Sequence, residues 1–126
     1  MFLAINTSDA RPIYQQVGDG IKELIARGEL KEGTVLPPVR QLAADLGVNL
    51  NTIAIAYREL QKEGLITVKH GSGSVVASRT STERNQDELL RPLRTALTQM
   101  VLAGWPESKI LKLVMNELNI VGKGNK

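Results

Sequence analysis

Apolar positions recur at helical spacing in five stretches of this 126-residue chain and alternate with polar positions in two short ones. Helical spacing runs through about 12–27, 39–46 and 50–62, and strand-like alternation follows at 65–69 and 74–77. Two further helical patterns lie at about 89–104 and 110–118. The order predicts a mainly α protein with a small β-hairpin after its third helix.

A sharp turn separates the second helical stretch from the third. Pro37 and Pro38 favour a helix start, because proline lacks the amide that a first helical turn leaves unbonded. Gly47 suits the left-handed conformation that ends a helix, and Asn49 is a good N-cap for the next one. Helix, turn, helix and hairpin together predict a winged helix-turn-helix fold with a β-wing, which indicates DNA binding.

The helix at 50–62 has two unlike faces. Its core face is apolar and comprises Ile53, Ala56, Tyr57 and Leu60. An amide, a hydroxyl, an arginine and several apolar groups occupy the remaining surface: Leu50, Asn51, Thr52, Ala54, Ile55 and Arg58. This mixture fits a major groove, because amides pair with adenine edges and apolar groups contact thymine methyls.

The hairpin carries a glycine-rich turn, His70-Gly71-Ser72-Gly73, at its tip. A phosphate-binding loop is a poor interpretation, because no Lys-Ser or Lys-Thr pair follows and the next element is a strand rather than a helix. Two interpretations stay open: a purely structural tip, and one that also contacts the DNA backbone or the minor groove.

Residues 13 to 77 resemble the DNA-binding domain of the GntR family of bacterial transcription regulators and are most similar to its YtrA-like subfamily. The resemblance rests on the GEL turn, the LPPVR segment and VNLNTIAIAYRELQKEGLI, in which an N-x-N-T start replaces an arginine-rich one. It implies a phosphate or base contact for Arg40. It also implies DNA contacts at the start of the reading helix and a wing tip beside them, that is, Asn49, Asn51, Thr52, His70 and Gly71.

These observations predict a set of DNA-binding residues with alternatives at three of them. Arg40 could instead pair with Asp45, and Arg58 could pair with Glu59. His70, the one histidine of the chain, could be an ordinary surface residue. The full set is Arg40, Asn49, Leu50, Asn51, Thr52, Ile55, Arg58, Lys69, His70 and Gly71.

The last two helical stretches form a second unit whose apolar stripes are too broad for one helical hairpin to bury. The winged domain, a second copy of the chain, or a small apolar ligand near Met100 and Trp105 could cover the rest. A two-fold dimer would place two reading helices about 34 Å apart, or a multiple of that, on a palindromic operator. Resemblance to the YtrA-like subfamily implies the same dimer. The predicted dimerisation residues are Leu89, Leu90, Leu93, Leu97, Met100, Val101, Ile110, Leu111, Val114, Met115 and Leu118.

The expected organisation is a winged domain at 1–78, a linker at 79–88, a two-helix dimerisation segment at 89–121 and a flexible tail at 122–126. Residues 2–5 are expected to form a short strand or a packing arm, and Pro92 indicates a late start or a bend in its helix. Gly18 and Gly20 each lower helix stability by about 1 kcal/mol relative to alanine. Either a neighbour packs closely there or the helix is soft.

Composition narrows the function classes. The absence of cysteine excludes a disulfide framework, a thiolate zinc site and a thiol nucleophile. One histidine and no carboxylates at metal or acid–base spacing argue against an enzyme, and no cofactor or metal is expected. Up to residue 78, eight Lys and Arg balance eight Asp and Glu, and eight against five beyond it give the net +3. Because DNA affinity depends on the cations that face phosphate, the motif order carries the DNA prediction.

No signal peptide or membrane span is expected, which predicts a soluble, cytoplasmic protein. The leading hypothesis is a homodimeric repressor that binds a palindromic operator and excludes polymerase. Its rivals are a regulator that responds to a small apolar effector and a winged-helix module that binds protein rather than DNA.

Overall fold

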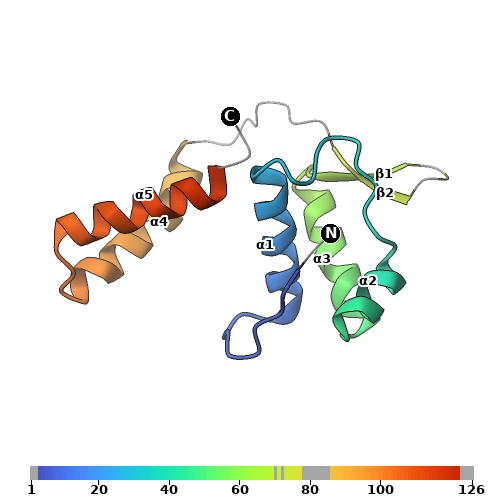
Figure 1. Ribbon diagram of the computed structural model, residues 1–126, viewed down its shortest axis with the longest axis horizontal. Helices are drawn as coiled ribbons and strands as arrows, with labels where there is room; N and C mark the ends of the chain where they lie inside the picture. Colours follow the sequence, from blue (N-terminus) through green and yellow to red (C-terminus); the bar gives the residue numbers. More distant parts are fainter. Residues whose placement is uncertain (1–2, 70, 72, 78–85, 123–126) are drawn as a thin grey trace.

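The computed structural model describes residues 3–69, 71, 73–77 and 86–122. Figure 1 shows a three-helix domain with a hairpin at one end and two further helices on the opposite side of its first helix. The described elements are α1 (Ile13–Ala26), α2 (Val39–Leu46), α3 (Leu50–Lys62), β1 (Ile66–Lys69), β2 (Gly73–Val76), α4 (Gln86–Leu102) and α5 (Glu107–Gly122). This order confirms the predicted mainly α fold with a β-wing.

A single apolar core joins α1, α2, α3 and the hairpin. The apolar face predicted for α3 is buried in full, and Ile53 and Leu60 have no exposed surface. The main core residues are Val17, Ile21, Leu24, Ile25, Leu30, Leu36, Leu42, Ala43, Ile53, Ala56, Tyr57, Leu60, Ile66 and Val76. Burial of this cluster is what holds three short helices together, since none is long enough to be stable alone.

The first turn of α1 shows that the apolar stripe of a helix and its buried face can differ. Ile13 and Tyr14 continue the helical apolar stripe, yet both are exposed. The reason is geometric, because the groove between α1 and α3 is open beside Tyr14 and Ala56. Helical periodicity identifies a face but not the point at which the neighbouring helix stops covering it.

The residues before α1 form a packing arm, one of the two expected alternatives. Leu3 packs against the core and lies over Gly20. The side chain of the buried Gln16 forms hydrogen bonds to the backbone of the arm at two positions. Its Oε1 accepts a hydrogen bond from the Asn6 amide at 3.0 Å, and its Nε2 donates to the Arg11 carbonyl at 3.0 Å. The close approach at Gly20 resolves one of the two glycine alternatives in favour of a packed neighbour.

The turn between α2 and α3 has the predicted chemistry. Gly47 adopts a left-handed conformation with φ of 69°, and its amide bonds to the last turn of α2. The Asn49 side chain then accepts a hydrogen bond from the Asn51 amide at 2.8 Å. These two residues fix where α2 ends and where α3 begins.

The wing is a two-stranded antiparallel sheet with a third segment beside it. Thr67 pairs with Val75 across the two strands, and Val75 also pairs with Val35 on its other side. The Leu36 amide donates to the Ser74 carbonyl at 2.8 Å. The segment before α2 is therefore attached to the wing, a contact that local sequence patterns do not predict.

The C-terminal helices begin earlier than expected. α4 starts at Gln86, so residues 86–88 of the predicted linker are helical, and Pro92 lies inside the helix rather than before it. Asp87 and Glu88 favour this early start, because carboxylates stabilise the positive end of a helix dipole. α5 extends to Gly122, one residue into the predicted tail, and it contacts α1. No helix among the described residues is long and apolar enough to cross a membrane.

Candidate nucleic-acid interface

The surface of α3 that turns away from the core carries the predicted mixture of groups. Asn51 and Arg58 are exposed, and Leu50 and Ile55 keep 39% and 36% of their surfaces accessible. Thr52 is half-buried. An amide, a guanidinium and apolar side chains are therefore exposed on one helix, the mixture that suits contacts with base edges and thymine methyls in a major groove.

Asn49 has a structural role at the edge of this surface. Its Oδ1 accepts a hydrogen bond from the backbone amide of Asn51, which does not use the two donors of its side-chain NH2 group, and the residue is exposed. The sequence pattern predicts both a cap and a DNA contact here. The structure shows the cap, and the DNA contact stays a prediction.

The predicted cations flank α3 on neighbouring elements. Arg40 is exposed on the first turn of α2, and Lys69 is exposed at the end of β1. In the described part of the chain no ion pair involves Arg40, and Asp45 instead accepts a hydrogen bond from Gln41 at 2.8 Å. Arg40 is therefore available to an external anion.

Arg58 and the wing tip are the remaining predicted contacts. Arg58 makes no ion pair with Glu59 within the described residues, and its side chain is exposed. Gly71 is exposed with φ of 84°, whereas His70 lies outside the described residues. The structure thus gathers the predicted contacts of α2, α3 and β1 around one domain, and the role of the histidine stays a prediction.

One hydrogen bond links the reading helix to the start of α2. The Tyr57 hydroxyl, on the buried face of α3, donates to the Pro37 carbonyl at 2.6 Å. Burial raises the pKa of Tyr57 to about 12, so the hydroxyl remains a neutral donor at ordinary pH. Sequence periodicity predicts the burial of the ring but gives no signal for the partner of the hydroxyl.

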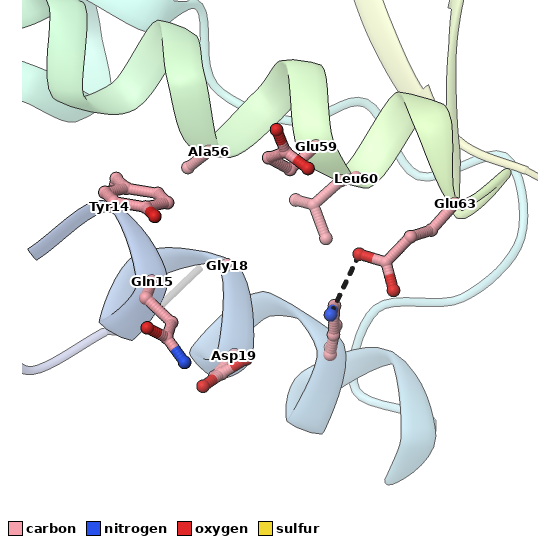
Figure 2. Close-up of a pocket in the computed structure, with 9 residues that line it drawn as sticks. Tyr14, Gln15, Gly18, Asp19, Ala56, Glu59, Leu60 and Glu63 are labelled. Atoms are coloured by element: carbon pink, nitrogen blue, oxygen red, sulfur yellow. Dashed lines mark ion pairs between the residues drawn. The ribbon is translucent and has the colours of Figure 1, made fainter. Parts of the chain in front are cut away.

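A groove of about 280 Å³ lies between α1 and α3, on the side of α3 that faces α1 (Figure 2). Gly18 lies at its wall, Glu59 and Leu60 project from α3, and the Lys22 ammonium bonds the Glu63 carboxylate at 2.9 Å across one end. Carboxylates around this groove repel phosphate, and none of the residues that line it belongs to the predicted DNA-binding set. Among the described residues no His, Cys, Asp and Glu cluster could hold a metal ion.

The predicted dimerisation residues are mostly uncovered within the chain. Ile110 is buried at 9% exposure, and α4 contains no buried residue. Half-buried positions are Leu90, Leu97, Met100 and Val114, and the exposed positions are Leu89, Leu93, Val101, Leu111, Met115 and Leu118.

The turn between α4 and α5 holds the residues predicted to line an effector site. Trp105 is half-buried, and the Lys109 ammonium lies 4.3 Å from the centre of its ring. A separate open groove of about 400 Å³ follows α4 and is lined by Leu97, Val101 and Leu102 together with two polar residues. A small apolar effector stays a prediction.

Comparison with known proteins agrees with this arrangement. Residues 13–76 match the family of bacterial regulatory proteins described as the gntR family. The chain is 32% identical over 100 residues to the HTH-type transcriptional repressor YtrA of Bacillus subtilis (strain 168), covering 79% of this chain and 76% of that protein.

Two solved structures are informative. A crystal structure described as a transcriptional antiterminator from Listeria monocytogenes EGD-e has a TM-score of 0.87 and 31% identity, covering 97% of this chain and 94% of that one. The DNA-binding domain of AraR, crystallised in complex with operator ORE1, has a TM-score of 0.51 and 27% identity, covering 61% of this chain and 94% of that one.

Proposed function

Because this chain belongs to the GntR family of bacterial regulatory proteins, we propose that it represses transcription as a homodimer that binds a palindromic operator through α3. Family membership also confirms the predicted class of helix-turn-helix regulator rather than enzyme. The observation that carries the proposal is the outward surface of α3, where Asn51, Ile55 and Arg58 are exposed, together with the exposed Arg40 on the first turn of α2. A repressor of this kind acts in the cytoplasm, where bacterial DNA lies.

Two relatives support the details of the proposal. YtrA of Bacillus subtilis is described as a repressor, and the AraR domain of similar fold binds operator DNA. In this chain α3 would enter the major groove, with the side-chain amide of Asn51 facing base edges. Arg40 and Lys69 would face phosphates. The predicted contacts of Asn49, Thr52 and the wing tip at 70–71 would extend the same surface.

The experiment that tests DNA reading is selection of bound sequences from a random pool of double-stranded DNA. The wild type should enrich an inverted repeat, and Asn51→Ala should weaken binding to it by roughly 1 to 3 kcal/mol, the value of one good amide–base pair. The matched control is Gln15→Ala, which removes an exposed amide on α1 beside the groove of Figure 2. Equal binding by Asn51→Ala and wild type would reject the assignment of this residue.

The proposed dimer rests on the apolar surface that α4 and α5 leave uncovered. Leu118 alone is 62% exposed, and Leu89, Leu93, Leu111 and Met115 are exposed as well. A second copy would bury these side chains, and each large apolar residue that is fully buried contributes about 1.5 to 3 kcal/mol. Palindromic half-sites would then follow from the two-fold axis.

The oligomeric state can be measured by sedimentation equilibrium with a matched pair of variants on α5. Leu118→Glu should shift the protein toward monomer, because the introduced carboxylate would be buried without a cation. Asn119→Glu adds the same charge at an exposed neighbouring polar position and should leave the dimer intact. A monomeric wild type, or a Leu118→Glu variant that stays dimeric at the wild-type affinity, would reject this interface.

A further inference from the structure

Tyr57 connects two parts of the proposed DNA interface that are 20 residues apart in sequence. Its ring belongs to the buried core, with the residue 6% exposed. The hydroxyl donates to the Pro37 carbonyl at 2.6 Å. This bond joins the middle of α3 to the residue that precedes the N-cap of α2.

The start of α2 packs on the core through Leu36 and Leu42 but makes few backbone hydrogen bonds to the rest of the domain. Pro37 and Pro38 carry no amide hydrogen, so this stretch cannot donate backbone hydrogen bonds. The first bond within α2 runs from the Leu42 amide to the Pro38 carbonyl at 3.0 Å and leaves the Pro37 carbonyl outside the helix. Upstream, the Leu36 amide bonds to Ser74 of the wing. The segment is therefore attached to the wing through Leu36 and to α3 through Tyr57.

Arg40 lies in the first turn of α2, two residues after Pro38. Its side chain is exposed and makes no ion pair in the described part of the chain, so the direction in which it points depends on where the backbone of the first turn lies. A shift of the first turn relative to α3 would move the guanidinium away from phosphates that align with the α3 surface. A displacement of the guanidinium by about 1 Å from a phosphate oxygen is enough to weaken a charge-assisted hydrogen bond between them.

We propose that Tyr57 is a positioning residue for DNA recognition, whose hydroxyl sets the start of α2 against α3 so that Arg40 and the outward surface of α3 engage one stretch of DNA. The inference rests on the proposed function of α3 as the reading helix. Removing the hydroxyl while keeping the ring preserves the core contacts, because phenylalanine and tyrosine have the same ring. What is lost is the hydrogen bond between α3 and the residue before the N-cap of α2.

The test is a double-mutant cycle in full-length protein, with affinity measured on the inverted repeat enriched by the wild type and on an unrelated duplex. Tyr57→Phe should weaken binding to the inverted repeat roughly 3- to 10-fold, the range for one net hydrogen bond. Binding to the unrelated duplex should weaken as well, because a phosphate contact carries no sequence information. In an Arg40→Ala background, Tyr57→Phe should cause no further loss, because the residue it positions is absent. The thermal unfolding midpoint of each variant is measured first, and binding is then measured at a temperature at which all variants are folded.

The matched control is Thr95→Val, which removes another hydroxyl-to-carbonyl hydrogen bond, from Thr95 to Arg91 at 3.1 Å on α4, and should leave DNA affinity unchanged. The same fold-loss from Tyr57→Phe with and without Arg40 would overturn the inference, as would unchanged affinity of Tyr57→Phe. In both cases Asn51→Ala would still lose binding, so the proposed function would stand. If no variant, including wild type, prefers any sequence, the proposed function fails and this inference fails with it.

Discussion

Alanine at Gly18 and at Gly20 should have different effects, although both glycines lie inside α1. Each substitution removes the helix penalty of glycine, which is about 1 kcal/mol. A Cβ at Gly18 would meet no atom within 4 Å, so Gly18→Ala should gain the full amount and raise Tm by roughly 3 to 6 °C. A Cβ at Gly20 would lie 2.7 Å from Cδ2 of Leu3, closer than carbon atoms approach.

Leu3 would have to turn aside to admit that methyl group. Because Leu3 is half-buried against the core, its displacement should forfeit about 1 kcal/mol of apolar burial, and Gly20→Ala should end near zero net change. Urea unfolding followed by circular dichroism gives both free energies. In a Leu3→Ala background, Gly20→Ala should recover the full gain of about 1 kcal/mol. Equal stabilisation by the two alanines in the wild-type background would refute the packing of Leu3 on Gly20, and destabilisation by Gly18→Ala would refute the open space beside that residue.

Three further predictions concern α3. Asn49→Ala should lower the unfolding free energy by about 1 kcal/mol in urea titrations, whereas Asn49→Asp, which keeps a capping oxygen, should not; equal losses would argue against the cap. Burial raises the pKa of Tyr57 to about 12, whereas an unfolded tyrosine has a pKa of about 10. The stability that the neutral hydroxyl contributes is therefore fully present below pH of about 10 and is lost as the pH rises toward 12. Urea unfolding across that range should show wild type losing roughly 1 to 2 kcal/mol more than Tyr57→Phe, and parallel curves would contradict the assignment. Ile53→Ala should cost about 2 to 5 kcal/mol of stability, because Ile53 has no exposed surface, and Ile55→Ala on the outward surface should change stability little but weaken operator binding; a comparable loss of stability at both positions would show that α3 has no free face.

Much of the winged domain could be predicted from sequence, because its determinants are local. Gly47 and Asn49 act within one turn of the chain, and the apolar positions of α3 follow a period of 3.6 residues that a folded core must satisfy. Glycine spacing and strand alternation predict the wing to within one residue. The outward surface of α3 follows from the same period, since residues that do not face the core face away from it.

Tertiary structure decided what lies between segments that are distant in sequence. Periodicity marks Tyr57 as buried, but only the approach of α2 to α3 gives its hydroxyl the Pro37 carbonyl as an acceptor. The sequence does not show why a glycine occupies position 20 of a helix, and only the path of the arm brings Leu3 over it. An amphipathic pattern encodes which side of a helix avoids water. It does not encode which other segment covers that side, because coverage depends on how the remaining elements pack and not on the residues of the helix itself.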